Sequence, residues 1–184
     1  MPWLIGIGAA VVVLVLWGVG TYNGFISGGT KVDEAFSTMD VYLQKRYDLI
    51  PNLVETVKGY AKHEKETLDA VVSARTAAHS ATNVEDKLKA ESELSGALGR
   101  LLMITEAYPE LKANTNFLNL QEDLQGMEGE IASARKYYNA VVRDYNIKVD
   151  SVPSNIIAGI FNFKKRPMFE IADESQRQNV KVQF

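Results

Sequence analysis

The first thirty residues carry no charged side chain, and this stretch limits the possible folds more than any other feature. All 20 basic and 23 acidic residues lie from Lys31 onward. Residues 3–22 are long enough, at about 1.5 Å per helical residue, to cross a hydrocarbon core of about 30 Å. Aromatic rings stand near both ends of this run, where the membrane interface favours them. The sequence therefore predicts one N-terminal transmembrane helix, with residues 1–29 as the anchor and its exit.

Two other interpretations of the apolar run are weaker. A cleaved signal peptide needs a basic segment before the run and a small-residue cleavage site, for which Ser27-Gly28-Gly29 is a poor candidate. A buried core helix is disfavoured because both ends run into glycine. Basic residues follow the run, beginning with Lys31, and none precedes it. The positive-inside rule then predicts a single-pass protein with its N-terminus outside and its C-terminal domain in the cytoplasm.

Three glycines recur at intervals of four where the anchor ends. Gly20, Gly24 and Gly28 therefore share one face of a helix. Small residues at this spacing let a second transmembrane helix approach closely, which would give a homo-oligomer through the anchor. The simpler interpretation, which we favour slightly, is that the glycines only loosen the exit from the membrane.

Beyond the anchor, apolar residues recur every three or four positions, which is the spacing of one helix face. Such stripes cover residues 32–71, 84–101 and 117–145. The third keeps a heptad repeat, as coiled coils do. No alternating strand pattern of useful length occurs. The sequence predicts an all-α fold in which three long helices and a short C-terminal helix form an elongated antiparallel bundle over residues 30–167.

Local signals set the expected helix boundaries. Thr30 and Asn83 are suited to cap the first and second bundle helices, and Pro109 separates the second from the third. Pro51 falls inside the first stripe. Because proline lacks an amide hydrogen and clashes with the preceding turn, it predicts a kink or a break, with a second helical piece beginning there. Residues 168–184 are expected to be disordered.

The stretch before that tail has two interpretations. Residues 156–163 are apolar nearly all round and are followed by Lys164-Lys165-Arg166. This segment could be a short helix that closes the bundle, or an amphipathic segment that touches acidic lipid. We favour bundle closure because the apolar residues do not gather on one clean face.

Composition and motifs give no sign of a catalytic, metal or cofactor site. The net charge is -3 and the one basic run is short, which excludes the broad positive field that nucleic acid needs. Cysteine is absent. Neither His63 nor His79 has a glutamate three residues before it, as di-iron bundles require. We expect no enzyme activity, no cofactor and no nucleic-acid partner.

Several polar residues fall on or beside the apolar stripes. They are Arg46, Asn52, Arg135, Asn139 and Asn146. Buried polar groups need partners, so these residues predict an internal hydrogen-bond network that fixes helix register. The alternative is a recognition groove for a peptide or a partner helix. The sequence leaves both open.

A set of motifs, in order along the chain, resembles the LemA family. They are Arg46-Tyr47-Asp48-Leu49-Ile50-Pro51-Asn52-Leu53-Val54, Tyr108-Pro109-Glu110-Leu111-Lys112-Ala113, Asn116-Phe117-Leu118-Asn119-Leu120-Gln121, Ala134-Arg135-x-x-Tyr138-Asn139-x-x-Val142 and Pro153-Ser154-Asn155-Ile156-Ile157-Ala158-Gly159. Two departures are Phe36, where the family usually has tryptophan, and Gly129-Glu130, which replaces a more usual Asn-Arg pair. The resemblance implies a bacterial inner-membrane protein with a cytoplasmic helical bundle. It implies no enzyme activity, because the family has no established biochemical function.

These observations favour a membrane-anchored scaffold or adaptor that presents a cytoplasmic helical bundle to other proteins. The main alternative is a ligand-binding or sensory bundle that uses the polar residues beside the core. A closed bundle interior would favour the scaffold, and a polar pocket of several hundred Å³ would favour the ligand site.

Overall fold

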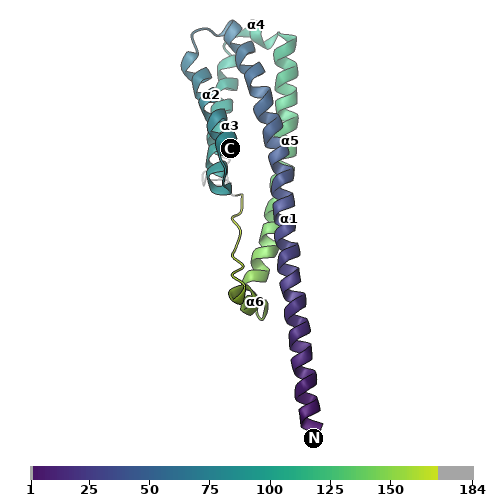
Figure 1. The fold of residues 1–184 in the computed structure, drawn as a ribbon. Helices are drawn as coiled ribbons and strands as arrows, with labels where there is room; N and C mark the ends of the chain where they lie inside the picture. Colours follow the sequence, from purple (N-terminus) through teal and green to yellow (C-terminus); the bar gives the residue numbers. More distant parts are fainter. Residues whose placement is uncertain (1, 170–184) are drawn as a thin grey trace, which may run out of the picture. The chain divides into compact units, whose positions relative to one another are not determined.

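The computed structural model describes residues 2–169, which are mainly helical and contain no strand (Figure 1). Their helices are α1 (Pro2–Tyr60), α2 (Lys65–Ser80), α3 (Val84–Thr105), α4 (Pro109–Lys112), α5 (Thr115–Asp150) and α6 (Ser154–Ile160). The predicted all-α fold is confirmed. Disorder is predicted for residues 168–184. Residues 170–184 of this tail lie outside the described residues.

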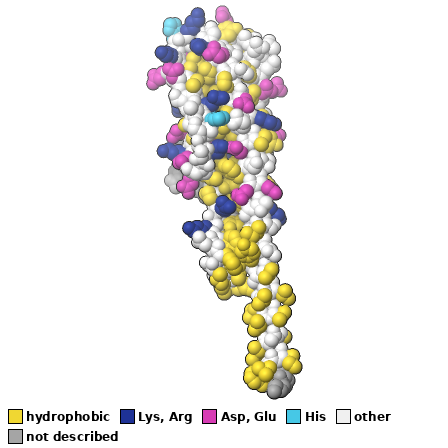
Figure 2. Space-filling view, in the orientation of Figure 1, with side chains coloured by type: hydrophobic (Ala, Val, Ile, Leu, Met, Phe, Trp, Pro, Cys, Tyr) yellow, Lys and Arg dark blue, Asp and Glu magenta, His cyan; other side chains and the backbone are white. Residues whose placement is uncertain are grey.

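Helix α1 joins the apolar anchor and the first bundle helix without interruption. The predicted cap at Thr30 is wrong, because its hydroxyl donates to the Ile26 carbonyl 3.1 Å away, as inside a helix. The most apolar 18-residue window of α1 has a mean hydropathy of 2.3 and is not buried. Within the described residues, α1 is the one helix long and apolar enough to cross a membrane. Figure 2 shows no charged side chain on the visible face of its N-terminal end.

Helix α1 also continues through Pro51 to Tyr60, so the predicted break is not found at Pro51. The second helical piece begins instead at Lys65, after a turn at residues 61–64. Proline at position 51 has no N–H for the carbonyl of Tyr47, four residues earlier. Arg75 of α2 replaces it, because its Nε donates to that carbonyl at 2.7 Å. A side chain from a neighbouring helix thus satisfies the group that the proline leaves open.

Two compact units divide the chain, and each is described on its own. Unit 1 comprises Met1–Met39 and Ala134–Met168. Unit 2 comprises Asp40–Ser133 and Phe169–Phe184. Helices α1 and α5 each contribute one segment to unit 1 and one segment to unit 2.

Unit 1 pairs α1 with the C-terminal half of α5 in antiparallel fashion. The ring of Phe25 meets that of Tyr145 at 6.1 Å, and Phe36 further along α1 meets Tyr138 at 5.9 Å. The antiparallel direction follows because the α5 partner comes earlier as α1 proceeds. Val142, rather than the Val141 of the heptad stripe, is the fully buried valine of this interface.

Unit 2 packs α2 and α3 side by side and joins them to its segments of α1 and α5. Its buried apolar side chains include Leu43, Ile50, Leu53, Val57, Leu68, Val71, Leu94, Leu101, Phe117, Leu124 and Ile131. The predicted cap at Asn83 is confirmed, since its side chain accepts from the Asp86 amide at 2.8 Å. Asn114 acts in the same way before α5, because its Oδ1 accepts from the Phe117 amide at 3.0 Å.

Candidate functional site

A charged cluster lies inside unit 2 and is centred on Arg46, whose side chain is 0% exposed. One guanidinium nitrogen, Nη2, binds the Glu91 carboxylate of α3. The other, Nη1, lies 2.6 Å from Glu128 Oε1 of α5 and 3.3 Å from Ser95 Oγ of α3. Arg46 therefore ties α1 to α3 and α5 through charge-assisted hydrogen bonds.

The neighbouring side chains complete this cluster. The Tyr47 hydroxyl donates to the second Glu91 oxygen, and burial together with that carboxylate raises the pKa of Tyr47 well above its usual range. Burial also raises the pKa of Glu91, which Arg46 and then the Tyr47 hydroxyl lower only in part. Lys87 of α3, nearly buried, pairs with Asp40 of α1. The carboxylate of Glu91 is thus surrounded by donors, and the arrangement is that of a structural ion network.

The other predicted polar residues lie at other positions along α1 and α5. Asn52 is exposed on α1. Arg135, Asn139 and Asn146 lie on α5 in unit 1 and are half-buried. Asn146 instead binds the chain after α6, because its amide donates to the Arg166 carbonyl at 2.9 Å and its oxygen accepts from the Arg166 amide at 2.8 Å.

Sequence reasoning missed the acidic partners of Arg46. Glu91 stands three residues after Leu88 and three before Leu94, so it falls on the apolar stripe of α3. An acidic residue on a core face was the available signal. Glu128 is half-buried and carries no comparable signal. Among the residues that the structure describes, no group of three histidine, cysteine or acidic side chains could hold a metal ion.

The glycine face of α1 packs partly against the chain itself. A Cβ at Gly28 would lie 3.1 Å from the Tyr145 ring of α5. A Cβ at Gly24 would collide with the Lys148 ammonium, whereas one at Gly20 would meet nothing within 4 Å. Two of the three glycines proposed for contact between transmembrane helices therefore face α5 in unit 1.

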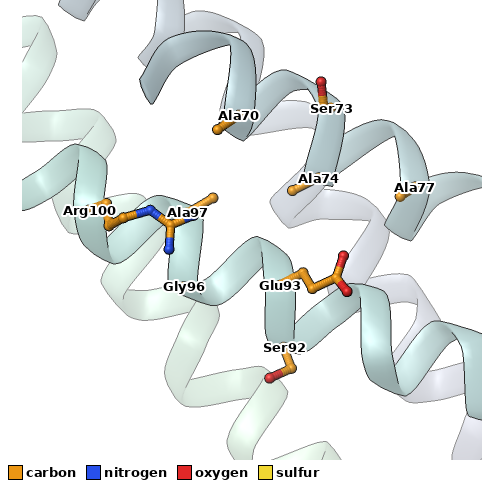
Figure 3. Close-up of a pocket in the computed structure, with 9 residues that line it drawn as sticks. All are labelled: Ala70, Ser73, Ala74, Ala77, Ser92, Glu93, Gly96, Ala97 and Arg100. Carbon is orange, nitrogen blue, oxygen red and sulfur yellow. The ribbon is translucent and has the colours of Figure 1, made fainter. Parts of the chain in front are cut away.

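A surface groove of about 570 Å³ runs between α2 and α3 (Figure 3). Its lining residues are Ala70, Ser73, Ala74, Ala77, Ser92, Glu93, Gly96, Ala97 and Arg100. All but two of these are alanine, serine or glycine, so the helix backbones lie close to the surface. The Arg100 guanidinium lies beside Gly96, with Nη1 3.8 Å from the position of a Cβ there. Glu93 stands seven residues before Arg100 and gives the same groove a negative charge.

A second groove, of about 700 Å³, lies between α1 and α2. Its lining includes three apolar residues, Val54, Leu68 and Val72, and three lysines, namely Lys58, Lys62 and Lys65. Glu55 and Asp69 also line it, and Lys58 is paired with Glu55 at 3.0 Å. The groove is therefore amphipathic and slightly basic.

The model of the LemA family matches residues 35–184. The chain belongs to the LemA family. The match begins after the charge-free stretch, so the family region of this LemA-family chain comprises the later part of α1 and everything that follows it.

Comparison with individual proteins gives distant relatives. Magnetosome protein MamQ 2 of Paramagnetospirillum magneticum (strain ATCC 700264 / AMB-1) is 26% identical over 175 residues, covering 81% of this chain and 64% of MamQ 2. Magnetosome protein MamQ of Magnetospirillum gryphiswaldense is 25% identical, covering 80% of this chain and 64% of its own length. Protein LemA of Metamycoplasma hominis is 24% identical, covering 88% and 74%. The chain thus spans 64% of the MamQ proteins that it matches. These relatives and the candidate membrane span of α1 indicate a membrane-associated protein.

Proposed function

We propose that this LemA-family chain is a membrane-anchored scaffold without catalytic activity, and that the groove between α2 and α3 receives a helix of a protein partner. The groove carries the proposal. Small side chains on both of its walls let the backbone of another helix approach closely, as in close helix pairs generally. Glu93 and Arg100 offer a negative and a positive group on the same surface, which would fix the direction of the incoming helix.

The interior of unit 2 supports a scaffold over a ligand-binding bundle. Its centre is filled by Arg46, Tyr47 and Glu91, and both Arg46 and Tyr47 donate to the Glu91 carboxylate. A ligand entering there would have to displace a paired guanidinium from a buried carboxylate, which is costly. The groove between α2 and α3 is open to the surface and needs no such displacement.

The proposal includes a location. With α1 spanning the bacterial inner membrane and the N-terminus outside, the groove would face the cytoplasm. The basic residues that follow the span support this orientation. The name of the MamQ relatives places those proteins at the magnetosome. For this chain we propose only a membrane surface at which partners are gathered.

Crosslinking in cells tests the groove. A photo-crosslinking amino acid is placed at Ala77, which is exposed and lines the groove. Gly96→Trp should fill the groove and abolish the crosslinked product. Gly99→Trp is the matched control, because Gly99 lies on the same helix, is exposed and does not line the groove. Crosslinking that survives both substitutions equally would remove the groove from the proposal.

The groove between α1 and α2 favours a second candidate function, a bundle that binds an amphipathic anion. Its apolar and lysine lining residues match an alkyl chain that carries a phosphate or carboxylate. Titration of the chain in nanodiscs with hexyl phosphate tests it by calorimetry. Lys62→Glu should abolish the heat, and Lys89→Glu, at an exposed lysine outside the groove, should leave it unchanged.

A further inference from the structure

Helix α6 packs against α1 at the level of the apolar run. A Cβ at Gly18 would lie 3.8 Å from Ile157 Cδ1, and Gly18 lies within the charge-free stretch. The chain after α6 continues the contact, since the Phe161 ring meets Tyr22 at 4.7 Å and the Phe163 ring stacks on Phe25 at 4.8 Å. All of these residues belong to unit 1. The segment therefore lies beside the last turns of the candidate membrane span.

The same segment also exposes large apolar side chains to its surroundings. Val152 is 80% exposed, Ile156 57%, Ile160 68% and Phe161 54%. Ile157 and Ala158 are buried, so part of α6 packs inside unit 1. The packing of Ile157 and Ala158 does not account for the exposed apolar side chains. Exposing a cluster of large apolar side chains to water is unfavourable. Large apolar patches on protein surfaces therefore mark sites that bind another protein, a ligand or a membrane.

Basic side chains come directly after the apolar cluster. Lys164 is exposed, and Lys165 pairs with Asp150 at 2.5 Å. Lys148 places its Nζ 4.9 Å from the centre of the Phe25 ring. This order, from apolar residues to aromatic rings to lysines, is the order in which side chains occur from the hydrocarbon to the phosphate level of a bilayer.

We propose that α6 and Phe161 lie in the interfacial layer of the same phospholipid bilayer that α1 crosses. Ile156, Ile160 and Phe161 enter the acyl region, and Lys164 reaches the phosphate level. The inference rests on the proposed membrane anchor and adds a second contact, which would fix the depth and rotation of unit 1 at the membrane. We assign the bilayer, rather than a protein, to this apolar surface because α6 packs directly on the candidate membrane span, which the same bilayer would surround.

Single-cysteine labelling tests this in the full chain, which has no native cysteine. A nitroxide is attached at Ile160→Cys in nanodiscs of mixed neutral and acidic phospholipid. Its collisions with oxygen, which concentrates in lipid, are compared with those of a water-soluble nickel chelate. Tyr137→Cys is the matched control, because Tyr137 is similarly exposed at 59% in unit 1 but lies on α5, beside the Phe36 level of α1. Val12→Cys reports the span.

The label at Ile160 should behave like the label at Val12, with oxygen collisions dominating and at least a several-fold lower nickel accessibility than at Tyr137. The same result at Ile156→Cys guards against a local disturbance by either label. Nickel accessibility at Ile160 equal to that at Tyr137, with Val12 in lipid, would overturn the inference and leave the anchor standing. A water-accessible label at Val12 would overturn both.

Discussion

At the residue scale, the decisive feature is a charge placed where no water reaches it. Arg46 is as buried as the leucines around it, yet every strong contact it makes is with an oxygen on another helix. The free energy of such a pair is asymmetric. Removing both partners can cost little, whereas removing one leaves a buried charge without its counter-ion.

Arg46→Ala should therefore lower the free energy of unfolding by about 3–5 kcal/mol, because Glu91 is left buried and uncompensated. Replacing both Arg46 and Glu91 by methionine should recover most of that loss. Lys58→Ala removes an exposed pair and should change stability by less than about 1 kcal/mol. Denaturant titration of the full chain in detergent measures all three. Equal losses in the single and double variants would mean that the pair is not the source of the cost.

Glu91 should also make stability depend on pH. Because burial raises its pKa above the ordinary 4.5, the folded chain retains a proton that the unfolded chain releases first as the pH rises. Its contribution to stability is full below 4.5 and is lost as the pH rises through the folded pKa. The unfolding free energy of the native chain relative to Glu91→Gln should thus fall over the pH interval that begins at 4.5. A difference that rises over this interval would show that the Arg46 pair outweighs burial.

Gly20, Gly24 and Gly28 could matter because they pack against α5 or because they loosen the helix at the membrane exit, and substitutions distinguish the two. Gly28→Leu forces the buried Tyr145 ring to move and should destabilise by about 1–3 kcal/mol. Gly20→Leu meets nothing within 4 Å and should not destabilise, since leucine is the better helix former. Thermal unfolding in detergent, followed by circular dichroism, compares the two. Equal melting temperatures would place Tyr145 away from Gly28.

At the element scale, a neighbouring helix decides whether α1 breaks. A proline inside a helix leaves a carbonyl without a donor, and the expected result is a kink or an end. Here Arg75 of α2 donates to the Tyr47 carbonyl, so the helix continues to Tyr60. The turn that does end α1 contains no proline, and Tyr108 and Asn114 bind Glu64 and Tyr60 beside it.

A double-mutant cycle tests this exchange of donors. Arg75→Ala should cost about 1–3 kcal/mol, because it leaves a buried carbonyl unsatisfied. In the Pro51→Ala background the restored backbone N–H can serve Tyr47, so the same Arg75 change should cost clearly less. The coupling is read from unfolding free energies of the four chains. Additive costs would show that Arg75 contributes through packing alone.

At the scale of the whole molecule, the charge pattern predicts topology. Basic residues follow the apolar run, and Lys148 and Lys164 join Lys31 in unit 1. A green fluorescent protein fused after Phe184 should therefore fluoresce, and alkaline phosphatase fused there should be inactive, since it folds only outside the cytoplasm. Efficient phosphatase activity from the fusion would reverse the orientation and move the proposed partner to the other side of the membrane.

The sequence by itself determined the all-α class, the apolar span of α1, the Asn83 cap and the apolar faces of the helices. These features depend on the spacing of neighbouring residues and on local hydrogen bonds, which the chain carries wherever it folds. Tertiary structure alone decided the rest. Thr30 lost its expected cap because α1 continues, Pro51 was tolerated because Arg75 reaches Tyr47, and Arg46 found Glu91 45 positions away. Such pairings join groups from different helices, and their energy exists only once the helices meet.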